Sequence, residues 1–273
     1  MLYSEFLRLK YQFKAKAALV LLLFYMLFSS VLLVRAIPRM VALYNTVGLT
    51  YQIDNFFFLW FGYHRFISIS EFRLLFFATR IFPFIFLPML LSWFGGDTFS
   101  SDYSNECDFL VYLRASRKKY FTEKLFMAFI GSFIIVVIML AFQLLLSVFG
   151  CLYLKQKGIL IPDFECDDLF ILLGPSIRIP LYYSSLVTLS CAVTLFIHTP
   201  AAAYMLPVAI AVGSSVLTAE LTNNVPMDLA FYDSGLMTPK MEIYWYLVIM
   251  FLTTAVFLTW VKICIEKDAL RTL

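Results

Sequence analysis

The sequence has little charge for its length. Only 14% of its 273 residues are Asp, Glu, Lys or Arg, whereas a soluble domain carries about 25%. Apolar side chains make up 62% of the chain, and the mean hydropathy is +0.86. This balance excludes an ordinary water-soluble protein. The formal net charge of +3 is too small to indicate a nucleic-acid partner.

The sequence also lacks clustered metal-binding or catalytic residues. Its five cysteines are widely spaced without a CxxC pair, and it has two histidines. Cys151 and Cys166 are the one pair that we consider for a disulfide, and the sequence leaves that pairing open. No HExxH, GxSG or GxxxxGK[ST] pattern occurs. We therefore expect no enzyme activity, resident cofactor or metal on this chain.

Two weaker chemical signals have simpler interpretations. Gly95-Gly96-Asp97 resembles the GxGD motif of intramembrane aspartyl proteases, but position 94 is Phe and no second intramembrane Asp completes a carboxylate pair. His198 falls at an expected turn and suits a structural or interfacial role. The apolar runs contain no Asp or Glu that would couple ion movement to transport, which argues against an ion-coupled carrier.

Long apolar runs dominate what is present. The run from Ala17 to Val34 would form a helix of roughly 27 Å, close to the bilayer hydrocarbon thickness of about 30 Å. The run from Leu125 to Leu154 exceeds this thickness, so we expect a tilted or projecting helix. The predicted fold is an all-α polytopic membrane protein with one transmembrane domain over 1–273. Its six spans are predicted at about 17–35, 74–95, 125–154, 179–198, 201–219 and 243–261.

Basic residues indicate how these spans are oriented. The Lys and Arg residues cluster before the first span, between the second and third spans, and after the last. Cytoplasmic segments carry such an excess, so we expect a multi-pass plasma-membrane protein with both termini in the cytoplasm. Residues 1–16 place four apolar side chains on one helical stripe, which predicts an interfacial helix or, alternatively, an extended leader.

A few residues inside the spans suggest a transport pathway or a helix interface. Pro83, Pro88 and Pro207 would kink their helices, or would be ordinary membrane-helix prolines. Arg80 must reach the interface or find a partner. Gly213 begins a run of small residues that would let helices approach closely.

The segment 97–124 is the strongest candidate for a docking element. Its acidic residues precede its basic residues, as favours a helix dipole. Its apolar residues recur at helical spacing and predict one face that fits a groove, with basic residues at the rim. A solvated or headgroup-bound loop is the alternative. The candidate docking residues are Glu106, Phe109, Tyr112, Leu113, Arg114 and Arg117.

Within this segment, the acidic stretch, Leu110, Arg114-Ala-Ser-Arg117 and Lys124 together resemble the membrane subunit of the ABC type-2 permeases. The resemblance covers the whole chain in topology, but Cys107 and Asp108 stand where that family has a Gly. It implies that the segment is a cytoplasmic coupling helix that docks on a separate ATPase subunit. It also implies a second permease copy or paralogue, and short outer helices over 220–242.

The resemblance implies ATP-driven export, in a bacterial membrane, of a peptide, a hydrophobic drug or a lipid-like molecule, with ATP and Mg bound by the partner subunit. The sequence leaves two other functions open. The chain is alternatively a non-transporting membrane assembly or immunity factor, or an ion-coupled secondary carrier. Membrane lipid is a partner in each case.

Overall fold

The computed structural model shows a set of packed helices. It describes residues 13–46, 82–94, 117–159, 166–194, 199, 201–202, 204–210 and 212–213. Over these residues no strand occurs, so the all-α prediction is confirmed for this part of the chain. The elements in chain order are α2 (Phe13–Thr46), α5 (Phe82–Leu91), η2 (Ser92–Phe94), α8 (Arg117–Gln156) and α9 (Cys166–Val193).

Two of these helices are long and apolar enough to cross a membrane. They are the segments Phe13–Arg39 of α2 and Tyr120–Gln156 of α8. Only 29% and 33% of their most apolar stretches are buried inside the protein, which is little for the core helix of a soluble domain. Ile179–Val193 of α9 is a shorter apolar helix. The described residues therefore support membrane-length helices but do not confirm six spans.

Three helices begin earlier than their predicted spans. α2 begins at Phe13, ahead of position 17, and continues to Thr46, past the predicted end at position 35. α8 begins at Arg117, ahead of position 125, because the intervening residues include no Gly or Pro and mostly favour helix. α9 begins at Cys166, ahead of position 179. Its charge-free run was interrupted by Arg178, but one polar residue does not end a helix. Asp167 and Asp168 fall in its first turn, where acidic residues favour a helix.

Other predicted elements lie outside the described residues. These are the last span, the short outer helices over 220–242, the cytoplasmic coupling helix and the interfacial helix before Phe13. The predicted spans 74–95 and 201–219 are described only in part.

α8 ends in a well-defined cap. The Ile159 N–H donates to the Leu154 carbonyl at 3.2 Å, and the Gly158 N–H donates to the Lys155 carbonyl at 3.0 Å. This pair of bonds is a Schellman motif, which satisfies carbonyls that the helix leaves unpaired. Gly158 has a φ of 78°, a conformation that is easy for glycine and costly for other residues. Leu154 is fully buried beneath the cap.

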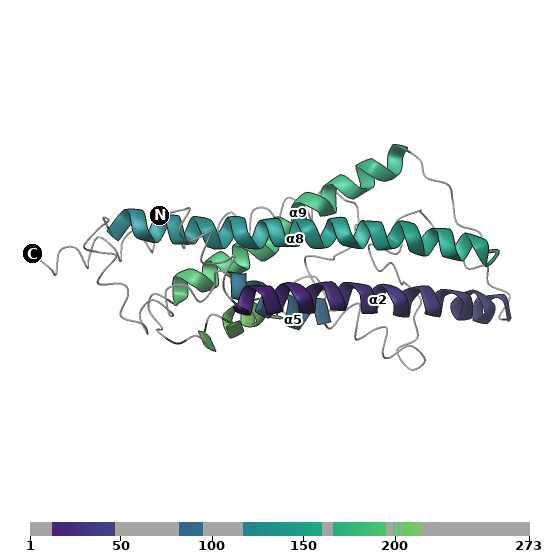
Figure 1. Cartoon of the computed structure of the whole chain (residues 1–273), viewed down its shortest axis with the longest axis horizontal. Coiled ribbons are helices and arrows are strands. Elements are labelled where there is room, and N and C mark those ends of the chain that lie inside the picture. The colour runs from purple at the N-terminus through teal and green to yellow at the C-terminus, as the bar shows by residue number, and fades with distance from the viewer. Residues whose placement is uncertain are drawn as a thin grey trace, which may run out of the picture.

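α9 runs in the opposite direction to α2 and α8. α2 and α8 lie side by side and run the same way, and α9 packs on α8 and runs back (Figure 1). The packing supports this direction, because the start of α8 contributes Tyr120 and Leu125 to a buried cluster that also holds Cys191 and Ala192 from the end of α9.

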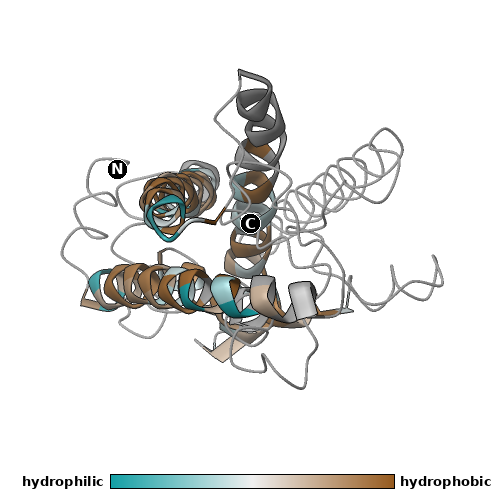
Figure 2. Ribbon diagram, turned by 90° about the vertical axis from the view of Figure 1, so that its right-hand side faces the viewer, coloured by the Kyte–Doolittle hydropathy of each residue, from teal (hydrophilic) through white to brown (hydrophobic). Residues whose placement is uncertain are grey.

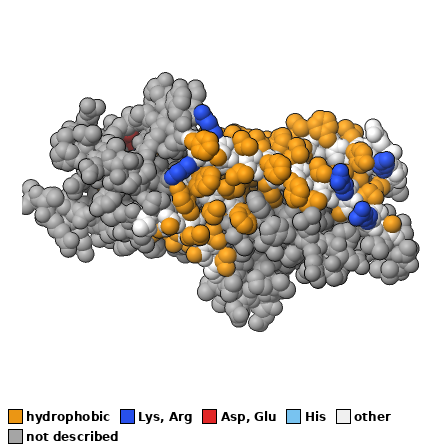
Figure 3. All heavy atoms as spheres, turned by 60° about the horizontal axis from the view of Figure 1, so that its bottom comes forward, with side chains coloured by type: hydrophobic (Ala, Val, Ile, Leu, Met, Phe, Trp, Pro, Cys, Tyr) orange, Lys and Arg blue, Asp and Glu red, His pale blue; other side chains and the backbone are white. Residues whose placement is uncertain are grey.

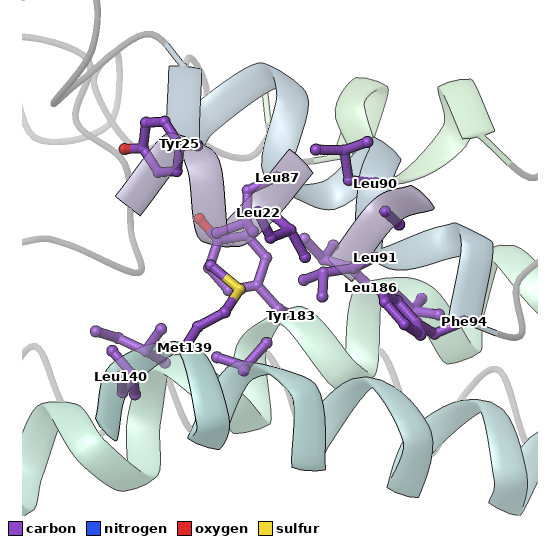
Figure 4. Close-up of a cluster of buried hydrophobic side chains, with 14 of the residues drawn as sticks. Leu22, Tyr25, Leu87, Leu90, Leu91, Phe94, Met139, Leu140, Tyr183 and Leu186 are labelled. Atoms are coloured by element: carbon purple, nitrogen blue, oxygen red, sulfur yellow. The ribbon is translucent and has the colours of Figure 1, made fainter. Parts of the chain in front are cut away.

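The main core lies between α2, α5, α8 and α9. Leu22 of α2, Leu87 of α5, Met139 of α8 and Tyr183 of α9 converge in it (Figure 4). Large apolar side chains are also exposed on the outside of α2 and α8, among them Phe24 and Leu145, and hydrophobic residues run along most of the coloured helices (Figure 2). This pattern differs from a soluble bundle, in which the outward faces are polar.

Candidate functional site

Most of the predicted docking residues fall outside the described part of the chain. Glu106, Phe109, Tyr112, Leu113 and Arg114 belong to this group. Arg117 is the first residue of α8, so the last part of the segment 97–124, from Arg117 onward, belongs to the longest described helix. The prediction of a separate coupling helix before α8 is not confirmed.

The end of the molecule that holds the starts of α2 and α8 contains several lysines, and we call it the lysine end. Lys14 and Lys16 are exposed on α2, whereas Lys124 on α8 is only 1% exposed. The Lys124 ammonium lies 4.8 Å from the centroid of the Tyr120 ring. An aromatic ring face attracts a cation most strongly when water is excluded. Tyr120 thus stabilises a charge that would otherwise be costly to bury.

The carboxylate of Glu123 lies next to this lysine in the sequence. Its Oε2 atom is buried and has no hydrogen-bond partner among the described residues. An unpartnered carboxylate oxygen is costly in an apolar environment. The first turns of α8 at the lysine end therefore hold a buried lysine and a half-buried glutamate with one buried oxygen atom.

A second cluster at the lysine end joins three distant segments. Lys14 of α2 donates a hydrogen bond from Nζ to the Tyr204 hydroxyl at 3.1 Å. The same ammonium lies 5.8 Å from the centroid of the Tyr204 ring. Trp93 of η2 meets that ring edge-on, with centroids 6.3 Å apart. Lysine, tyrosine and tryptophan are typical of a membrane–water interface, so this cluster suits a position where a span leaves the bilayer.

A polar contact joins α2 to α8 far from either end. The Gln143 Nε2 donates to the Ser30 Oγ at 3.1 Å, and the Ser30 Oγ donates to the Gln143 Oε1 at 3.3 Å. Both side chains are buried. Sequence reasoning missed this pair, although Gln143 is the one amide side chain in the charge-free run 125–154. An amide in such a run was the available signal for an interhelical contact.

Other buried hydroxyls bond within their own helices. Ser132 donates to the Ala128 carbonyl at 2.6 Å, and Ser190 donates to the Leu186 carbonyl at 2.8 Å. These bonds satisfy the hydroxyl without a neighbouring helix. The same arrangement holds for Ser29, Ser147 and Ser184. Ser92 of η2 and Thr194, which follows α9, bond in the same way to the last turn of the preceding helix.

The structure does not bring the predicted pathway residues into one described site. Arg80 lies outside the described residues, and Pro83 is described only as part of the α5 backbone. Pro88 is buried in α5, where its carbonyl accepts the hydroxyl of Ser92 at 3.0 Å. Pro207 is buried in the helical stretch 204–210. Gly213 is exposed, and a Cβ added there would meet no atom within 4 Å.

The described residues offer binding and positioning groups. Among them, no group of three or more His, Cys, Asp or Glu side chains could hold a metal ion. Cys151 is a buried thiol that forms no disulfide, so the pairing with Cys166 that the sequence left open does not occur. Comparison with family models, with curated proteins and with solved structures found no match for this chain.

Proposed function

We propose that this chain is the membrane permease subunit of an ATP-driven exporter of the ABC type-2 kind. In this proposal a separate ATPase subunit binds ATP and Mg, and its docking site is the segment that ends at Arg117. The observation that carries most weight is the continuity of α8. This helix runs from Arg117 to Gln156, so a displacement at the docking segment would reach the bilayer without passing through a loop.

The packing at the lysine end supports the same mechanism. Tyr120 and Leu125 of α8 share a buried cluster with Cys191 and Ala192 of α9. Packed interiors are dense and transmit displacement instead of absorbing it. A force at Arg117 would therefore move the start of α8 and the end of α9 together, and the Ser30–Gln143 bond would carry the movement to α2.

The exposed surface supports the membrane location. Apolar side chains form a band over the described part of the face in Figure 3, with basic side chains toward both ends of the band. Large apolar residues are exposed on both α2 and α8, including Phe24, Leu27, Ile134 and Leu145. A multi-pass bacterial plasma-membrane protein with both termini in the cytoplasm accommodates this surface.

The docking surface can be tested by comparing two double variants. Phe109→Ala with Tyr112→Ala should abolish co-purification of a P-loop ATPase subunit, because loss of buried aromatic anchors typically costs about 2 kcal/mol or more. Arg114→Ala with Arg117→Ala should weaken it less, since an exposed ion pair contributes about 0 to 1 kcal/mol. The measurement is the amount of ATPase subunit and of ATP hydrolysis in material purified at matched expression.

The variants also separate this proposal from its alternatives. If the basic pair proves decisive and the aromatic pair silent, the segment binds anionic headgroups and the permease proposal loses its support. If no P-loop ATPase accompanies the unaltered chain when it is purified from its native membrane, a non-transporting assembly or immunity factor becomes the better explanation.

A further inference from the structure

The charged residues of α2 mark the boundaries of an apolar segment. Lys14 and Lys16 are exposed at one end, and Arg35 and Arg39 are exposed at the other. The rise from Lys16 to Arg35 is roughly 28 Å at about 1.5 Å per residue. This length matches a hydrocarbon core of about 30 Å. The segment of α2 between Lys16 and Arg35 therefore marks the two boundaries of the bilayer hydrocarbon.

The contact between α2 and α8 shows which residues of α8 lie at the same two boundaries. The two helices run in the same direction (Figure 1), and Ser30 lies opposite Gln143. Counting equal steps back from this pair places Phe129 at the level of Lys16, and counting forward places Val148 at the level of Arg35.

The charge-free run of α8 is too long to define the bilayer by itself. From Leu125 to Leu154 it would measure roughly 45 Å. Fitting that length into about 30 Å requires a tilt of about 48°, beyond the range of up to about 40° that membrane helices adopt. α2 packs along α8, so such a tilt would also leave the apolar segment of α2 too short to span.

Glu123 and Lys124, at the start of α8, favour hydrocarbon over the shorter stretch 129–148 and not over the whole charge-free run 125–154. With a boundary at Phe129, Glu123 and Lys124 lie outside the hydrocarbon, where a charge costs less than in the bilayer centre. The cluster of Tyr120, Leu125 and Ala128 with Cys191 and Ala192 then forms the small core of a two-helix extension. Figure 1 shows the start of α8 reaching past the start of α2.

We infer that bilayer hydrocarbon covers only the middle of α8, from about Phe129 to Val148. The first three turns of α8, paired with the end of α9, form a projecting stalk on the lysine side. The occupant of the apolar band is lipid, because the band is bounded by exposed basic residues at the spacing of a hydrocarbon core. This inference rests on the membrane location in the proposed function and not on an ATPase.

Four exposed apolar residues of α8 provide matched probe positions. Phe126, Ile134, Leu145 and Leu152 have exposed fractions between 48% and 52%. We would place a nitroxide label at each position through a single cysteine, in a background without the native cysteines. The chain would be reconstituted in phosphatidylcholine–phosphatidylglycerol vesicles. Accessibility of each label to oxygen and to a water-soluble nickel chelate would then be measured.

We expect labels at 134 and 145 to favour oxygen, as in hydrocarbon, and labels at 126 and 152 to favour the nickel chelate by several-fold. Equal preference for oxygen at all four positions would overturn the stalk. Protection of 134 and 145 from both reagents would overturn lipid as the occupant and indicate a protein contact, such as a second copy of the chain. Preference for nickel at all four would overturn the membrane location itself.

A second measurement avoids the cysteine substitutions. Amide hydrogen exchange of the unaltered chain in the same vesicles should be faster over 117–128 than over 130–147, because water reaches only the former. Equal protection of the two segments would also contradict the stalk. Both experiments omit the ATPase, so failure of the coupling proposal would leave their outcomes unchanged.

Discussion

At the scale of single residues, Gln143 and Ser30 carry the contact that joins two apolar helices. Gln143→Leu should lower the free energy of unfolding by about 0.6 to 1.7 kcal/mol, the range measured for hydrogen bonds between membrane helices. Ser30→Ala should cost a similar amount, and the double variant should cost less than the two losses combined. Reversible unfolding in mixed micelles provides the measurement.

Ser190→Ala supplies the control for this cycle. Its hydroxyl is buried and bonds to the Leu186 carbonyl of its own helix, so its removal tests the loss of a hydroxyl without the loss of an interhelical contact. Fully additive effects of Gln143→Leu and Ser30→Ala would show that the two residues act independently.

Contacts between side chains of different helices were the features least predictable from the sequence. Gln143 is the one amide in its charge-free run, but a one-dimensional pattern does not specify which residue of another helix faces it. Lys124 was recognised as part of a motif and proved to be buried against Tyr120. The meeting of Lys14, Trp93 and Tyr204 depends on the packing of three segments, which no local pattern encodes.

At the scale of elements, the end of α8 depends on one backbone conformation. Gly158→Ala should destabilise the protein by about 1 to 2 kcal/mol, because a residue with a side chain pays that amount to adopt a positive φ. The same substitution at Gly213 should change stability by less than about 0.5 kcal/mol, since a Cβ there meets nothing within 4 Å. Thermal unfolding of the two variants side by side gives the comparison.

If Gly158→Ala were as mild as Gly213→Ala, the cap would not contribute to the stability of α8.

Helix type was easier to predict than helix length in this chain. Long apolar runs identified α2 and α8, yet α8 and α9 extend into polar sequence. The reason is physical, because charged residues interrupt an apolar run without interrupting backbone hydrogen bonds.

At the scale of the whole molecule, we propose that two copies or paralogues pair, and Gly213 gives this proposal a specific test. Gly213 is exposed, with open space around its Cα, and small residues let membrane helices approach closely. Gly213→Leu should leave the monomer folded while reducing the dimer fraction in native mass spectrometry. Gly213→Ala should reduce it less.

An unchanged dimer fraction in Gly213→Leu would exclude this part of the surface from the subunit contact. A chain that is monomeric before substitution would exclude the pairing itself under those conditions. The long apolar runs predicted membrane-length helices, but they do not indicate how many chains assemble. A helix surface that contacts lipid and one that contacts a second apolar helix have similar side chains.

The hydroxyl groups that bond within their own helices also set the limits of sequence divergence. Each such serine or threonine bonds to a carbonyl of its own chain and does not depend on a neighbouring helix, so alanine or cysteine of similar volume can replace it with little loss. Ser132, Ser184 and Ser190 belong to this interchangeable class. Ser30 and Gln143 do not, because each must change in step with the other. Relatives of this chain should therefore differ freely at the first set and vary together at the second.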